Sequence, residues 1–223
     1  MRVLGIETSS LRGSVALVEG ARVVATAHHE EPHRHGERLL PLLDGLLADR
    51  GWSRSSLDRI GVGVGPGSFT GLRVGIALAT GLSLGLGVPL VGVGSLQALA
   101  ARHPASDPRL RVVVRDARRN EHFVAVYDVD GSERAEPQAV PQALTPERVR
   151  TLVGDEPFVV LGTLLPDLPC ADDEPSRGPD AEAVARLAAH LAPDAHPALP
   201  HYVRGPNAIR PHLPPSPLAL PRT

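Results

Sequence analysis

The chain of 223 residues is long enough to fold as one large domain or as two smaller lobes. Its formal net charge of −2 creates no field that would attract nucleic acid, and only 3% of its residues are aromatic, which disfavours a base-stacking surface. The single cysteine excludes an internal disulfide bond and is typical of a reducing compartment, so a cytoplasmic protein is expected.

The N-terminal part predicts a small sheet and one helix. Residues 2–10, 13–20 and 22–30 are apolar runs separated by short turns, which predicts three strands in an antiparallel meander. The first of these strands ends at an acidic turn that contains Glu7. Residues 36–50 place leucines at helical spacing with charges elsewhere, which predicts an amphipathic helix.

A long stretch without charge follows. Residues 59–66 predict a strand buried on both faces, and a helix is expected from about Ser68 to Leu86, followed by a strand at 88–93. Residues 74–101 carry no charge, and this length would suffice to cross a membrane. The stretch nevertheless contains six glycines and has no aromatic residue at either end, so no membrane span is expected.

The middle of the chain repeats the pattern of its beginning. After a short helix with Ser95 as its N-cap, residues 110–131 again form strand, acidic turn and strand. An overlay without gaps places Asp116 on Glu7. The repeat predicts an internal duplication into two lobes, with chance similarity as the alternative.

The last third contains fewer regular patterns. Residues 157–163 predict a buried strand, and residues 180–192 predict an amphipathic helix. From Pro193 onward prolines are dense, so the chain is expected to be extended apart from the short "HYVR" at 201–204.

Two features of the predicted turns resemble nucleotide sites. Glu7 and Asp116 could hold the magnesium and phosphates of ATP across a cleft, or they could be ordinary hairpin-turn residues. The "GPGSFTGLR" stretch at 65–73 places glycines before a helix start, where Ser68 or Thr70 caps free amides. Because the stretch has no lysine for a phosphate, a tight turn with a cap is the favoured interpretation.

Four histidines gather in the "HHEEPHRHGE" stretch at 28–37. They lack the regular spacing and the additional thiolates or carboxylate of zinc sites, so a solvated polar loop is favoured over a metal site. The histidines are His28, His29, His33 and His35.

The uncharged helix carries a nearly bare stripe, because small residues recur every four positions. Such a stripe allows another element to approach closely and is destabilising in water unless something covers it. The cover is either the protein's own sheet or the helix of a partner, and the pattern alone leaves both open. The stripe consists of Gly71, Gly75, Ala79 and Ser83.

Several quoted motifs together resemble one family. "VLGIETSS", "HGERLLPLL", "GVGPGSFTGLRVGIALATG" and "RDARRNEHFVAVY" occur in the order seen in the bacterial TsaB (YeaZ) family, and the resemblance covers residues 1 to about 130. It implies an α/β, actin-like two-lobed fold of the sugar-kinase and Hsp70 type, with duplicated mixed sheets and flanking helices. Lobes at 1–105 and 106–197 and a proline-rich tail at 198–223 are then expected.

The resemblance also implies a function. A TsaB-like protein would be a non-catalytic scaffold or activator in forming N6-threonylcarbamoyladenosine at position 37 of tRNAs that read codons beginning with A. Its expected partners are a TsaD-like transferase and a TsaE-like ATPase, with tRNA reached only through the complex and a homodimer left open. The expected partner interface comprises His35, Arg38, Leu39, Leu42, Leu46, Gly71, Val74, Gly75, Leu78, Ala79 and Leu82.

The same resemblance predicts that catalysis has been lost. The two metal-binding histidines of the transferase correspond to Ser95 and Leu99, which cannot coordinate iron or zinc. Glu7, Thr8 and Ser9 stand as a degenerate phosphate turn, so no metal, catalytic residue or cofactor is expected, with ATP or ADP at the partner junction left open. The alternative hypothesis is a stand-alone ATP-binding or metallopeptidase-like enzyme.

Overall fold

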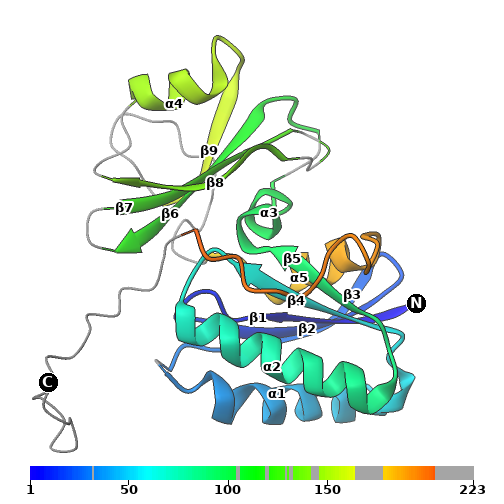
Figure 1. Ribbon diagram of the computed structural model, residues 1–223. Coiled ribbons are helices and arrows are strands. Elements are labelled where there is room, and N and C mark those ends of the chain that lie inside the picture. Colours follow the sequence, from blue (N-terminus) through cyan, green and yellow to red (C-terminus); the bar gives the residue numbers. More distant parts are fainter. Residues whose placement is uncertain are drawn as a thin grey trace, which may run out of the picture.

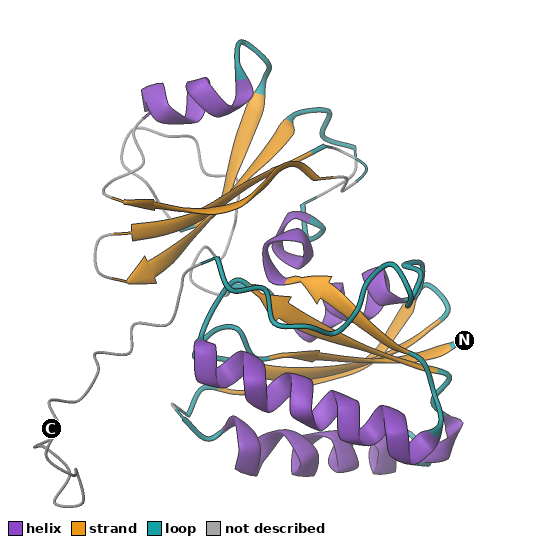
Figure 2. Ribbon diagram, in the orientation of Figure 1, coloured by secondary structure: helices purple, strands orange, loops and turns teal. Residues whose placement is uncertain are grey.

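A computed structural model shows two mixed sheets, each flanked by helices (Figures 1 and 2). The first sheet has the strand order β3-β2-β1-β4-β5, and the second has the order β8-β7-β6-β9. The structure describes residues 1–31, 33–103, 106–118, 121–128, 130, 133–141, 146–163 and 178–203.

The first sheet contains the predicted meander and two parallel strands. In the meander, β1 (Arg2–Glu7), β2 (Gly13–Glu19) and β3 (Arg22–His29) pair antiparallel. On the other side of β1, β4 (Arg59–Gly65) pairs with it in parallel, and β5 (Leu90–Gly94) pairs with β4. Between their charged end residues Arg2, Glu7 and Arg59, these central strands contain only apolar residues, as expected where helices cover both faces of a sheet.

Helices α1 (His35–Asp49) and α2 (Phe69–Leu86) lie side by side across one face of this sheet (Figure 1). A short 3-10 helix (Arg54–Ser56) follows α1. Helix α5 (Ala181–Ala188) covers the opposite face and packs on β1, β2 and β4. Although α5 comes late in the chain, inside the expected second lobe, it belongs to the core of the first sheet.

The second sheet repeats the strand order of the first. Strand β6 (Leu110–Arg118) pairs antiparallel with β7 (Glu121–Tyr127) and parallel with β9 (Phe158–Gly162), as β1 does with β2 and β4. Strand β8 (Glu133–Pro141) lies outside β7, as β3 lies outside β2. Helix α4 (Pro146–Val153) packs on this sheet through Val149 and Val153. The predicted duplication of mixed sheets is therefore confirmed.

Helix α3 (Ser95–Ala100) joins the two sheets, and both of its sides are buried. Ala98 packs in the cluster of the first sheet and α5, whereas Leu96 and Leu99 pack in the cluster formed by β6, β7 and β9. Gly94, and not the predicted Ser95, is the N-cap of this helix, because the Ser95 hydroxyl donates to Glu7 instead. Helix α3 therefore contributes side chains to a core cluster on each of the two sheets.

The C-terminal part of the described chain runs along the first sheet without regular structure. The Gly92 amide donates to the His196 carbonyl (2.8 Å), and the His201 amide donates to the Val64 carbonyl (2.7 Å). Residues 204–223, which make up most of the predicted tail, lie outside the described residues. The domain boundaries expected at 105/106 and 197/198 stay predictions.

Candidate functional site

The carboxylate of Glu7, the last residue of β1, points into the core of the first lobe. Glu7 is fully buried; its Oε1 accepts a hydrogen bond from the Ser9 amide (2.6 Å) and its Oε2 accepts one from the Ser95 hydroxyl (2.9 Å). Burial raises the pKa of the Glu7 carboxyl. A side chain at Gly63 would collide with this carboxylate, so the absence of a Cβ there makes room for it. Glu7 is therefore a buried structural residue that links the turn after β1 to the first residue of α3.

The two turn carboxylates do not form a pair across the cleft. Asp116 is exposed and lines the cavity between the lobes, whereas Glu7 is sealed away and does not line it. Thr8 is also fully buried, and its carbonyl lies against Gly71 of α2. The Ser9 carbonyl accepts from the Ser68 amide (2.7 Å), so residues of the predicted phosphate turn hold the start of α2 in place.

A cavity of about 780 Å³ lies between the lobes. The turn at residues 9–11 and the start of α2 form one side, and the end of β6 at Arg115 and Asp116 faces them. Ser68 caps α2 by accepting from the Gly71 amide (3.2 Å). The chain contains no lysine, so the cavity lacks the ammonium group that meets a phosphate in P-loop proteins.

The bare stripe of α2 is covered by the protein itself. Gly71, Gly75 and Ala79 are buried, and a Cβ at Gly75 would collide with the Thr8 side chain. The turn after β1 therefore occupies the space beside Gly71 and Gly75, and Ala79 packs in the core under the first sheet. Partner contact at these three residues stays a prediction, and the isolated chain leaves little of their surface accessible.

Three of the expected interface residues on α1 are also buried within the chain. Leu39 and Leu46 belong to the core under the first sheet, and His35 is buried beside β3. Leu39 and Leu46 face inward as part of the apolar stripe of an amphipathic helix, and His35 faces inward through its hydrogen bonds with His29 and Ser10. Their place in the expected interface stays a prediction.

No helix or strand of the described chain packs over the opposite, outward face of α2. Only four of its 18 residues are buried, and Leu84 is 80% exposed. Val74, Leu78 and Leu82, three of the expected interface residues, are half-buried. Helix α2 is long and apolar enough to span a membrane, but its inner face packs on the sheet as part of the lobe.

Helix α1 borders this face with small and charged residues. Leu42 is half-buried, while Pro41 and Gly45 are exposed. Arg38 is exposed and forms an ion pair with Glu31 (2.6 Å). An apolar centre with charged residues at its border is the usual arrangement of a protein interface.

Two of the four histidines meet in a buried pair. His35 Nε2 lies 3.1 Å from the Ser10 carbonyl oxygen, which only accepts, so this nitrogen carries the proton. His35 Nδ1 then accepts from His29 Nε2 at 3.0 Å. Burial lowers the pKa of both rings. His28 and His33 are exposed, and no group of three metal-ligating side chains exists among the residues that the structure describes.

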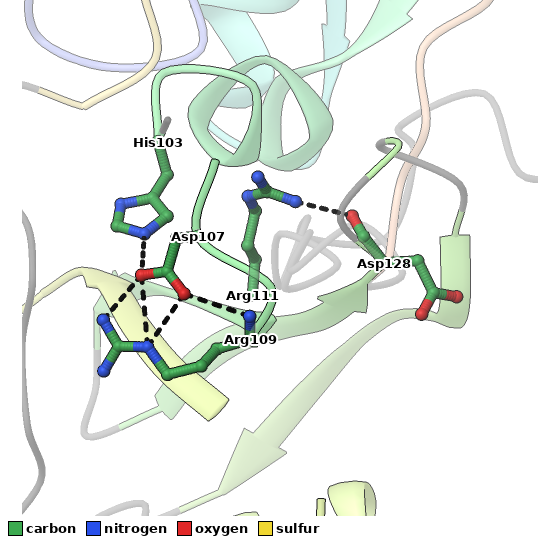
Figure 3. Close-up of polar contacts among 5 residues, drawn as sticks. All are labelled: His103, Asp107, Arg109, Arg111 and Asp128. Atoms are coloured by element: carbon green, nitrogen blue, oxygen red, sulfur yellow. Dashed lines mark hydrogen bonds and ion pairs between the residues drawn. The ribbon is translucent and has the colours of Figure 1, made fainter. Parts of the chain in front are cut away.

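The connection from α3 to β6 is held by a polar cluster (Figure 3). Asp107 accepts hydrogen bonds from His103 Nε2 (2.8 Å) and from the Arg109 guanidinium (2.6 Å). These two donors hold the pKa of Asp107 well below its usual range, Arg109 most strongly. Nearby, buried Arg111 donates to the Asp128 carbonyl (2.8 Å). The cluster fixes the path of the chain between the lobes.

Sequence reasoning missed one surface cluster. Phe69 and Arg73 of α2 contact Tyr202, which comes from the far end of the described chain. The spacing of Phe69 and Arg73 places them on one helix face, but nothing in the sequence indicates that Tyr202 reaches them.

Comparisons with known proteins agree with this architecture. A family model of tRNA N6-adenosine threonylcarbamoyltransferase (TsaD) matches residues 27–152. The tRNA threonylcarbamoyladenosine biosynthesis protein TsaB of Escherichia coli is 34% identical over 170 residues, which cover 73% of this chain and 71% of that protein. An uncharacterized protein of Mycobacterium tuberculosis is 35% identical over 214 residues, which cover 92% and 93% of the two chains.

Solved structures show the same fold. The YeaZ-like protein of Pseudomonas aeruginosa superposes with a TM-score of 0.74 at 29% identity, covering 91% of this chain and 99% of that one. The repeated strand order and the joined sheets define an actin-like, two-lobed α/β protein. Within that class, the chain belongs to the TsaB (YeaZ) branch of the family that the TsaD model describes.

Proposed function

We propose that this chain is a non-catalytic subunit of the assembly that forms N6-threonylcarbamoyladenosine at position 37 of tRNAs reading codons that begin with A, and that it binds a TsaD-like transferase. The relatives named TsaB support the process. The single observation that carries the binding role is α2, a helix of 18 residues whose outward face is uncharged except for Arg73 and open to solvent. Such a face is costly to leave in water.

The family match also suggests what covers this face. The transferase model matches residues 27–152, a range that includes α1 and α2. A transferase of that family therefore has counterparts of these two helices, and two equivalent faces can pack helix against helix. Arg38, Leu42, Val74, Leu78 and Leu82 are the expected contact residues that remain accessible.

A non-catalytic role is supported by the residues that stand where the transferase has its metal ligands and its phosphate turn. Ser95 and Leu99, at the positions of the transferase's metal ligands, are both buried, and Glu7 is sealed by its own hydrogen bonds. The proposal includes a TsaE-like ATPase as a further component, tRNA contact through the complex and a cytoplasmic location. The proposal is compatible with a homodimer of the free chain. It is also compatible with ATP or ADP bound at the junction with the partner.

A charge on the exposed face of α2 tests the binding role. Leu84→Asp is expected to weaken association with the transferase of the same organism by about tenfold or more, because the carboxylate loses its water in the interface. Leu199→Asp is the matched control, since Leu199 is 68% exposed but lies outside α1 and α2. Affinities come from calorimetry on the purified chains. Equal affinity of both variants and the unmodified chain would contradict the proposed interface.

A nucleotide titration separates the scaffold from the stand-alone enzyme. The isolated chain is expected to show no binding of ATP with magnesium by calorimetry, because the sealed Glu7 and the absence of lysine leave neither a facing carboxylate pair nor a phosphate-binding ammonium. Micromolar binding at a stoichiometry near one would favour the enzyme instead.

A further inference from the structure

An aromatic and cationic cluster stands on the surface where α2 begins. The rings of Phe69 and Tyr202 have centroids 5.0 Å apart, and the Arg73 guanidinium lies 3.8 Å from the centroid of the Phe69 ring. Arg73 Nε also donates a hydrogen bond to the Tyr202 hydroxyl (3.0 Å). Two stretches 129 residues apart are thereby held in one small group, which we call the Phe69–Arg73–Tyr202 cluster.

The exposure of this cluster is unusual for the chain. The sequence contains only three phenylalanines, two tyrosines and one tryptophan, yet Phe69 is 43% and Tyr202 40% exposed. Leu11, 54% exposed, lines the same interlobe cavity as both rings. Three large apolar side chains thus converge on one part of the surface, where leaving them in water is unfavourable.

The segment that carries Tyr202 does not depend on the cluster to stay in place. The His201 amide donates to the Val64 carbonyl of β4 (2.7 Å), and the Gly92 amide of β5 donates to the His196 carbonyl (2.8 Å). The backbone is therefore fixed by the sheet, while the Tyr202 ring remains on the surface with its hydroxyl oriented by Arg73. A preoriented aromatic group loses little conformational entropy when it is covered.

The cluster is continuous with the exposed face of α2. Phe69, Arg73 and Ala77 follow one another at four-residue spacing, and Leu84 lies on the same side of the helix. A protein that covers the outward face of α2 therefore reaches the cluster at the N-terminal end of the helix. Tyrosine and arginine are enriched among the residues that dominate binding energy in protein interfaces.

We propose that Phe69, Arg73 and Tyr202 anchor the contact with the transferase, so that the interface extends beyond the two helices to the side chain of Tyr202. This inference rests on the proposed function. The transferase is the occupant because a family whose model matches residues 27–152 has its own counterpart of α2, which can pack against this face, and because the cluster continues the face. Tyr202 itself lies outside the matched range.

Truncation of the rings tests the proposal. Phe69→Ala and Tyr202→Ala are each expected to weaken transferase binding by about tenfold or more, the effect typical of central interface residues. Tyr202→Phe keeps the ring and loses only the hydrogen bond from Arg73, so a loss of about two- to tenfold is expected. Leu199→Ala, on the same C-terminal segment, is the control and is expected to leave the affinity unchanged. Calorimetry with the full-length chains gives the affinities.

The variants are expected to stay folded, because both rings are partly exposed and belong to none of the core clusters of the described residues. Thermal unfolding of each isolated variant checks this point. Arg73→Lys adds a second measurement, since lysine keeps the charge but not the planar group over Phe69, and it is expected to bind more weakly than the unmodified chain.

The outcomes separate this inference from the proposed function. If Leu84→Asp weakens transferase binding and the cluster variants bind as the unmodified chain does, the anchor is overturned and the proposed function stands. If the unmodified chain does not bind the transferase, both fail. If the cluster variants keep their affinity for transferase but lose binding to single-stranded RNA, the cluster is a platform for stacking bases and the anchor is again overturned.

Discussion

At the scale of single residues, the buried His29–His35 pair makes the first lobe sensitive to acid. His35 Nε2–H donates to the Ser10 carbonyl, and His35 Nδ1 accepts from His29. Burial opposes protonation of both rings and lowers the pKa of each, and a proton on His35 Nδ1 would in addition face the N–H of His29. His29 Nδ1 is buried without a partner among the described residues. Of the charged groups nearby, Glu31 favours protonation of His29, whereas Arg38 and His28 oppose it; His33 opposes protonation of His35.

The pair therefore predicts a loss of stability in mild acid. Both pKa values are lowered by folding from about 6.5, so the unfolded chain binds more protons as the pH falls below that value. The stabilisation is complete above about pH 6.5 and is lost as the pH falls through the folded pKa values. The free energy of unfolding in urea, measured between pH 8 and 5, should decline more steeply for the unmodified chain than for a His29→Gln, His35→Gln double variant. His190→Gln, at an exposed position after α5, is the control and should follow the unmodified chain, because His190 is not among the groups that act on either ring.

At the scale of elements, α2 has two faces that respond oppositely to the same substitution. Gly75 lies against Thr8, whereas a Cβ at Gly81 would meet no atom of the described residues within 4 Å. Gly75→Leu should cost about 3 kcal/mol or prevent folding, because its side chain has no space and must displace the turn after β1. Gly81→Leu should keep or raise the stability by up to about 1 kcal/mol, since leucine has the higher helix propensity. Urea denaturation of the isolated chain checks both, and a stable Gly75→Leu variant would show that the stripe is not packed as described.

The elements also show how far the sequence predicts the structure. The first meander, α1, α2 and β9 were predicted closely, because their apolar residues follow a strand or helix period over most of their length. Strand β8 was not predicted, since prolines and charges interrupt its sequence and it is held at an edge by pairing with β7. The sequence did not decide which side of α2 contacts the sheet, because a stripe with Gly71 and Gly75 can pack equally well against a strand or against a partner. The role of Tyr202 depends on a tertiary contact that no local pattern contains.

At the scale of the whole molecule, the lobes are joined by more than the connecting chain. Arg102, just after α3, donates to the Gly178 carbonyl (2.9 Å) and lies 3.7 Å from Asp180, the residue that caps α5. Arg102 follows α3, the last helix before the second sheet, and Gly178 precedes α5, which packs on the first sheet, so one guanidinium ties these two parts of the chain together. With α3 packed on both sheets, this arrangement disfavours independent motion of the lobes.

The joined core predicts that both lobes unfold together. Leu99 is buried between α3 and the second sheet, so Leu99→Ala should cost about 2–5 kcal/mol through the cavity that it leaves. Because that cavity weakens the contact between the lobes, calorimetry should show one thermal transition for the unmodified chain and two, or one clearly broadened, for Leu99→Ala. Leu43→Ala is the matched control: Leu43 is equally buried but belongs only to the core under the first sheet. This control should lower the melting temperature and keep a single transition, because α3 still couples the lobes. Two transitions in the unmodified chain would mean that the packing of α3 does not couple them.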